Sequence, residues 1–159
     1  LIWMPPVGGE TSLQNAALSF QLAQFAHHTG TWISFASSAG FHLADGSVLS
    51  PDASLLRLDR WRALTPEERR GFAPLCPDLV VELASPSDEG PRGVTALREK
   101  MAAYQANGAR LGWLLIPHDQ AVEVWPASGA PQRLEQLQML EATPEFPGLQ
   151  LQLEEIWAG

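Results

Sequence analysis

The stretch CPDLVVELASPSD, residues 76–88, places one acidic residue inside an apolar run and then turns sharply. Leu79 to Ala84 has the length and composition of a buried strand, and Glu82 lies within it. An unpaired charge in such a strand costs several kcal/mol, so the carboxylate is expected to be paired, neutralised or bound to a cation. The fold must therefore supply a partner for Glu82.

The chain before this strand is predicted to form one long helix, several strands and a short surface helix. An acid and two hydroxyl residues at 10–12 precede an apolar stretch, so the long helix is expected to run from there to about His28. Thr65-Pro66 followed by two glutamates is typical of a helix start and predicts the surface helix within 60–72. Asp45-Gly46 predicts a hairpin, and the strands are expected over 31–36, 40–43 and 48–58.

The chain after the buried strand repeats the alternation of helix and strand. Residues 85–93 read as a Pro-, Gly- and Ser-rich loop, and a helix is expected from about Thr95 to Asn107, closed by Gly108. Further strands are expected over 111–116, 121–125 and 149–153. This order predicts one domain over residues 1–159, of the α/β class, with a mixed sheet flanked by helices.

Composition limits the classes of function. The 159 residues carry a formal net charge of −8, which repels phosphate backbones, so any nucleic-acid role has to rest on a local site. The single cysteine excludes an intramolecular disulfide and a cysteine-based zinc cluster, and it fits a reducing cytoplasm. No apolar run approaches the roughly 18 residues of a membrane span. A cytoplasmic protein with no membrane partner is therefore expected.

A second acid, Asp52 in LSPDASLL, is predicted to lie on a strand like Glu82. Adjacent strands are about 4.8 Å apart, so two inward carboxylates on neighbouring strands can hold one Mg²⁺ or Mn²⁺ ion. The structural alternative is that Asp52 caps a turn after Pro51 while Glu82 pairs with an arginine. Spacing alone leaves both interpretations open. Asp78, in another Pro-Asp pair, is a rival acid that is more easily explained as a turn or capping residue.

Lys100 is the only lysine in the chain, in which the other nine basic side chains are arginines. On a helix it lies beside the apolar stripe of Leu97, Met101 and Tyr104, so its ammonium is expected to point toward the sheet. A compact ammonium can stabilise a charged transition state, whereas a lysine at the edge of the stripe can equally extend to solvent. Tyr104 and Gln105 are further candidates to line a site. Trp61 lies among five arginines that are candidates for a DNA-facing patch: Arg57, Arg60, Arg62, Arg69 and Arg70.

Three stretches resemble the Uma-type restriction endonucleases, a bacterial branch of the PD-(D/E)XK nuclease superfamily. They are GGETSLQNA (8–16), the segment from GFHLADG to ASPSD (40–88), and LREKMAAYQANGARLGWLLIP (97–117). The resemblance implies a restriction-endonuclease-like α-β-β-β-α-β core, with Asp52 as the superfamily aspartate and Glu82 as the second acid. Glu10 matches an acid that many members place on the first helix beside the site.

The superfamily's acid-x-lysine tripeptide requires lysine at position 84, where this chain has alanine. The resemblance implies that the lysine has moved to the following helix, at Lys100. The expected function is that of a metal-dependent endonuclease that hydrolyses DNA phosphodiester bonds. Asp52 and Glu82 would bind Mg²⁺ or Mn²⁺, and Lys100 and Glu10 would complete the catalytic set. A homodimer is expected, with contacts near Trp3 and Trp157. The alternative is a catalytically inactive nuclease-fold module that acts in protein interaction.

Overall fold

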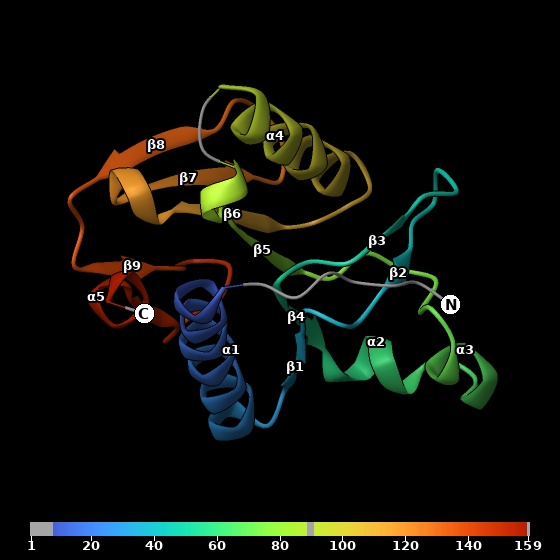
Figure 1. Ribbon diagram of the computed structural model, residues 1–159. Coiled ribbons are helices and arrows are strands. Elements are labelled where there is room, and N and C mark those ends of the chain that lie inside the picture. The colour runs from blue at the N-terminus through green and yellow to red at the C-terminus, as the bar shows by residue number, and fades with distance from the viewer. Residues whose placement is uncertain (1–7, 89–90, 159) are drawn as a thin grey trace.

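The computed structural model describes residues 8–88 and 91–158, which form a mixed sheet with helices on both faces (Figure 1). Its six-stranded sheet is ordered β1 (Trp32–Ala36), β4 (Ala53–Arg57), β5 (Leu79–Leu83), β6 (Leu111–Ile116), β7 (Ala121–Pro126) and β8 (Gln132–Glu135). Within this sheet β5 and β6 are parallel, and the other neighbours are antiparallel. The predicted α/β class, with its α-β-β-β-α-β core, is confirmed.

The remaining elements surround this sheet. The longer helices are α1 (Gly9–Thr29) and α4 (Pro91–Ala106), and the short ones are α2 (Leu58–Arg62), α3 (Pro66–Arg70) and α5 (Leu153–Trp157). Two hairpin-like pairs join β2 (Phe41–His42) to β3 (Val48–Leu49), and β9 (Met139–Glu141) to β10 (Gln150–Gln152). Single 3₁₀ turns, η1 (Pro86–Asp88) and η2 (Pro117–Asp119), follow β5 and β6. None of the helices in the described ranges is long and apolar enough to cross a bilayer.

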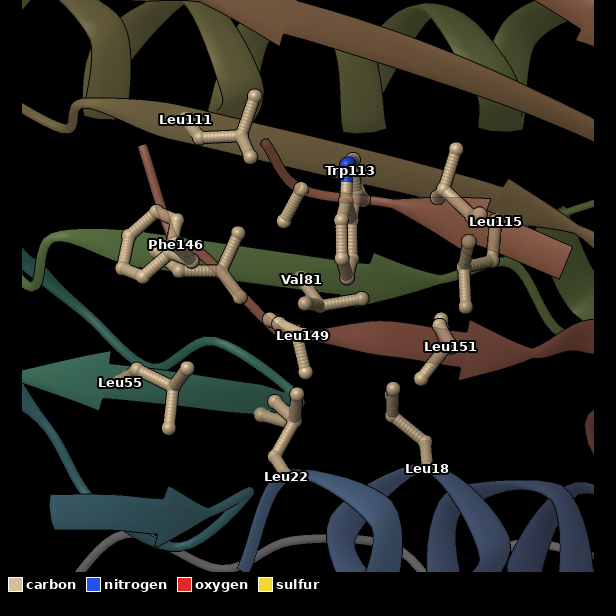
Figure 2. Close-up of a cluster of buried hydrophobic side chains, with 14 of the residues drawn as sticks. Leu18, Leu22, Leu55, Val81, Leu111, Trp113, Leu115, Phe146, Leu149 and Leu151 are labelled. Carbon is tan, nitrogen blue, oxygen red and sulfur yellow. The ribbon is translucent and has the colours of Figure 1, made fainter. Parts of the chain in front are cut away.

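One face of the sheet packs against α1 and the C-terminal segment. Leu18 and Leu22 of α1 are fully buried and face side chains of β4, β5 and β6, among them Leu55 and Trp113 (Figure 2). Burial of an aliphatic side chain of this size contributes about 1.5–3 kcal/mol. Leu149 and Leu151, which flank the start of β10, pack into the same cluster.

The side chain of Gln21 on α1 both donates to and accepts from the backbone of Gln152 in β10. Its side-chain amide donates to the carbonyl of Gln152 over 3.0 Å, and its side-chain oxygen accepts from the Gln152 N–H over 2.7 Å. Gln21 is buried, so these bonds satisfy polar groups that would otherwise be costly inside the protein. Residues 131 positions apart are thereby joined.

The opposite face of the sheet carries α4. Met101 and Tyr104 point from α4 into a second apolar cluster with Val80 and Leu114. Beside this cluster the buried carboxylate of Glu123 on β7 accepts from Arg98 of α4, with Nε 2.9 Å from Oε2. Strand register places Glu82, Leu114 and Glu123 in one row across β5, β6 and β7. Glu82 and Glu123 therefore lie on opposite sides of β6, the strand on which α4 packs.

Several predicted elements are confirmed, and one strand is corrected. The first helix, the Thr65–Glu68 capping box and the strands at 79–83 and 111–116 lie where they were expected. The strand expected over 48–58 is wrong as a single element, because β3 pairs with β2 whereas β4 pairs with β1 and β5. Pro51 has no N–H to donate, so the chain changes partners there. Residue 58 already begins α2, and β8 and β9 were not predicted.

The Arg98–Glu123 pair is expected to be needed for stability. Arg98→Ala leaves a buried carboxylate without its counter-charge, which should lower the free energy of unfolding by about 3 kcal/mol. Adding Glu123→Leu should restore most of that loss, because the double variant has no buried charge to compensate. Urea denaturation of the single and double variants measures both effects. A double variant as unstable as Arg98→Ala alone would contradict this role for the pair.

Candidate catalytic site

Strand register brings Asp52 beside Glu82. Ala53 of β4 faces Val81 of β5, so one further step along the ladder sets Asp52 opposite Glu82. The ladder does not continue there through backbone atoms. Instead the Asp52 carboxylate accepts the Leu83 N–H, with Oδ2 2.7 Å from the nitrogen. This bond fixes the Asp52 carboxylate at the end of the sheet, next to that of Glu82.

Glu82 receives two donors from α4. The Lys100 ammonium lies 2.9 Å from Oε2 of Glu82, and the hydroxyl of Tyr104 donates to the same oxygen over 2.8 Å. Lys100 and Tyr104 lie four positions apart on α4, so both reach the sheet from one side of the helix. Glu82 is 2% exposed, which means that these groups replace the water it would otherwise bind. The partner that a buried carboxylate at position 82 requires is therefore Lys100.

Lys100 joins this buried carboxylate to a more accessible surface. Its side chain is 28% exposed, and its ammonium also donates to the Ser50 carbonyl over 3.2 Å. Ser50 precedes Pro51 and Asp52, at the break between β3 and β4. The ammonium therefore bridges β5 and the β3–β4 connection, with one side open to solvent. Asp52, Glu82 and Lys100 come together in this way, and they are called the acid–lysine trio below.

The negative charge of Asp52 opposes ionisation of Glu82, whereas a side-chain hydrogen bond with Glu82 lowers the pKa of Asp52. Burial raises the pKa of Glu82 to about 7, and the charge of Asp52 acts in the same direction, against the stabilising effect of Lys100. Burial also raises the pKa of Asp52, with the Leu83 N–H and Lys100 opposing it. The pKa of Tyr104 is raised by burial and by Glu82, so its hydroxyl keeps its proton and remains a donor. One added positive charge would favour ionisation of both acids.

A cavity of about 510 Å³ adjoins the trio beyond the ends of β5 and β6. Its walls include Glu10 and Gln14 of α1, Ser85 and Asp88 of the loop after β5, and Arg98 of α4. The trio does not line this cavity, but Ala84 does, and it directly follows Leu83, whose N–H donates to Asp52. Glu10 is exposed at the cavity wall and, within the described ranges, makes no hydrogen bond or ion pair with the trio.

The other residues singled out in the sequence have structural roles. Asp78 is buried, accepts the Arg57 N–H over 3.0 Å and pairs with Arg60 over 3.0 Å, as expected of a turn or capping residue. Gln105 donates to the carbonyls of Pro126 and Gly129, away from the trio. Trp3 lies outside the described residues.

Sequence reasoning missed two contributors to this region. The carbonyl of Ser50 carries no signal in its side chain, so its contact with Lys100 had no marker in the sequence. Glu123 did have one, because AVEVW places an acid inside an apolar strand just as LVVELA does. Like Glu82, an acid at this position needs a cationic partner, and the partner of Glu123 is Arg98.

The pair of acids fits a hard divalent cation. Mg²⁺ is commonly held by one or two carboxylates, with water and substrate oxygens completing six positions. Asp52 and Glu82 supply two carboxylates, and the charge of Asp52 raises the pKa of Glu82 against the effect of Lys100. Among the residues described, no three or more His, Cys, Asp or Glu side chains gather around a common point. Two carboxylates are within the number that Mg²⁺ commonly takes from a protein.

Comparisons with known proteins identify the family and the fold of the chain. A family model described as "Uma2: Putative restriction endonuclease" matches residues 1–154. The fold is similar to the crystal structure of a protein from Anabaena variabilis, described as a putative nuclease belonging to DUF820. The TM-score is 0.77 at 18% sequence identity, over 99% of this chain and 85% of the other. No curated protein matches the sequence.

Stability should depend on pH through Glu82. The folded chain keeps the Glu82 proton up to about pH 7, whereas the ordinary carboxyl pKa is 4.5. Between these values the folded state binds more protons, so the free energy of unfolding falls as pH rises. Without divalent ions, wild type should lose up to about 3 kcal/mol relative to Glu82→Gln between pH 4.5 and 7.5.

Urea denaturation across this range, with the exposed Glu67→Gln as a matched control, measures the difference. A stability difference between wild type and Glu82→Gln that does not change with pH would show that Glu82 titrates normally.

Proposed function

We propose that this chain, which belongs to the Uma2 family of restriction-endonuclease-like proteins, is a divalent-metal-dependent endonuclease that hydrolyses DNA phosphodiester bonds. The observation that carries the proposal is the convergence of Asp52, Glu82 and Lys100 at the end of the sheet. Two carboxylates and one ammonium at a half-open position match what hydrolysis of a phosphodiester requires. The family match favours the same class of substrate.

Asp52 and Glu82 would hold Mg²⁺ or Mn²⁺. When bound, the ion would supply positive charge at the scissile phosphate and lower the pKa of an attacking water. The protein's contribution is positional: the Leu83 N–H fixes Asp52, and the Tyr104 hydroxyl fixes Glu82. Both carboxylates are therefore oriented before substrate arrives.

Lys100 would stabilise the negative charge that develops on the phosphate. Its ammonium is held between Glu82 and the Ser50 carbonyl, and its 28% exposure leaves room for a phosphate oxygen to approach. A preorganised cation in such a site is worth far more than one in water. Glu10, at the wall of the 510 Å³ cavity, would act from the rim, through bound water or a second ion.

The second candidate is an inactive module that keeps the nuclease fold and binds other proteins. The net charge of −8 favours it, because such a surface repels DNA outside local sites. The two candidates differ in one measurable property. A nuclease cleaves DNA in the presence of Mg²⁺ or Mn²⁺, whereas an interaction module cleaves none of the substrates offered.

Lys100→Met should keep the fold, since methionine retains most of the stem, but reduce the rate of cleavage roughly 100-fold or more. Lys100→Arg should also be impaired, because a planar guanidinium cannot reproduce a compact ammonium. The assay follows cleavage of single-stranded, duplex and branched DNA with each metal. Asp52→Asn, which keeps an oxygen for the Leu83 N–H, is the matched control for contaminating nuclease. Full activity in Lys100→Met would remove the lysine from the mechanism, and full activity in Asp52→Asn would remove the site.

We also propose that the chain acts as a homodimer, because soluble oligomers are most often two-fold symmetric dimers. Multi-angle light scattering at micromolar concentration should give twice the 17.3 kDa mass of the chain. Trp157 on α5 is half-buried, and it is one of the two residues expected at the dimer contact. Trp157→Ala should shift the equilibrium toward monomer. A wild-type protein with the mass of one chain would contradict the dimer.

A further inference from the structure

The arginines of this acidic chain are concentrated in one segment. Residues 57–72 contain five of the nine arginines, whereas the whole chain has a formal net charge of −8. The structure places this segment in α2, α3 and the turn after them, on the side of the sheet where β1 lies at the edge (Figure 1). The proposed nuclease activity assigns no role to this basic segment.

A second cavity, of about 450 Å³, lies between this segment and the connection from β1 to β2. Four aromatic rings and two arginines contribute to its walls: Phe35, Phe41, Trp61, Phe72, Arg69 and Arg70. None of the described residues that line it is acidic, whereas Glu10, Asp88 and Asp119 all line the larger cavity beside the trio. This second cavity is called the aromatic–arginine pocket.

Among the described residues, Arg69 and Arg70 form no ion pair, although Glu67 and Glu68 precede them on α3. The Arg69 guanidinium lies 5.9 Å from the centroid of the Trp61 ring and donates to the backbone carbonyls of Trp61 and Arg62. Arg70 is exposed and makes no hydrogen bond or ion pair within the described part of the chain. By contrast, Arg98 and Arg133 at the larger cavity each pair with an acid. The pocket therefore offers cationic groups to an anionic ligand.

Phe72 gives the pocket an accessible ring. Its side chain is 51% exposed, and a Cβ at Gly40 would lie 2.8 Å from Cδ1 of Phe72. Glycine at position 40 thus allows the ring to lie against the β1–β2 connection. Exposed aromatic rings beside arginines are the arrangement on which unpaired nucleic-acid bases stack while their phosphates are bound.

Ser50 connects the pocket to the acid–lysine trio. Its carbonyl accepts from Lys100, and its hydroxyl lies 2.8 and 2.6 Å from the carbonyl oxygens of Ser37 and Ala39, between which its one proton is shared. Ala39 in turn lines the pocket. The two regions are therefore neighbours along the β3–β4 connection.

From these contacts we propose that the aromatic–arginine pocket binds unpaired nucleotides that flank the scissile phosphate, so that the preferred substrate is single-stranded or has a single-stranded branch. The pocket volume is that of a small-molecule site, which suits one or two nucleotides. A duplex keeps its base faces inside its own stack and cannot offer them to Phe72. This inference rests on the proposed nuclease function and names the class of substrate for that site.

Binding is measured apart from cleavage, by fluorescence anisotropy of labelled oligonucleotides in EDTA. Wild type should bind a single strand at least tenfold more tightly than the duplex of the same sequence. Phe72→Ala and Arg70→Ala should each weaken single-strand binding roughly tenfold. Arg70→Ala should also reduce the slope of log affinity against log salt by about one.

Matched controls remove the same groups outside the pocket. Phe20→Ala removes a phenylalanine of α1 that is 64% exposed, and Arg62→Ala removes an exposed arginine of the same basic segment that does not line the pocket. Both should bind single strands within about twofold of wild type. Circular dichroism and urea midpoints establish that all four variants are folded.

The outcomes separate this inference from the nuclease proposal. Equal affinity for single strand and duplex, or a Phe72→Ala variant that binds like Phe20→Ala, would overturn the pocket even if wild type cleaves DNA. If the exposed patch binds another protein and not nucleic acid, Phe72→Ala would bind single strands like Phe20→Ala. Selective single-strand binding that depends on Phe72 and Arg70 would uphold the pocket even if no metal supports cleavage.

Discussion

A carboxylate buried beneath a helix is the constraint on which the arrangement of this protein depends. Glu82 lies in a central strand and cannot reach bulk water, so α4 must bring Lys100 and Tyr104 to it. Glu123 imposes the same condition two strands away and is met by Arg98 of the same helix. Two acids in one row of the sheet thereby fix where α4 lies. Because α4 is held on both sides by these contacts, Lys100 is held in place as well.

The distribution of charge around the trio differs sharply between its two sides. Toward the ends of β5 and β6, acids and arginines neutralise one another in pairs. Toward β1 and α3, Arg69 and Arg70 line a pocket with aromatic rings and no acidic residue in its described walls, while Glu67 and Glu68 lie elsewhere on α3. An acidic protein could bind a polyanion at such a pocket, because the Debye length at physiological salt is only about 8 Å and local charge governs contact.

The sequence predicted the elements better than the contacts between them. Local chemistry predicts the start of α3 at Thr65, the end of α1 at Gly30 and strands such as LVVEL. These predictions are confirmed. The partners of each strand depend on register, which local pattern does not encode, so the exchange of partners at Pro51 was missed. Glu82 and Lys100 stood out by their rarity in their surroundings, whereas the role of Ser50 lies in a backbone carbonyl that every residue possesses. The aromatic–arginine pocket joins residues 35 to 73 in space, and only its arginine content was visible beforehand.

The paired hydrogen bonds between Gln21 and Gln152 tie α1 to a segment made more than a hundred residues later. Ribosomal synthesis delivers α1 first, yet the face that carries Leu18 and Leu22 has no full cover until β10 has emerged. Until that moment the nascent chain exposes an apolar helix face beside unfinished strands, the kind of surface that chaperones bind. The same cluster also contains Leu153 and Ile156 of α5, so the cover of α1 is completed only by the final described segments of the chain.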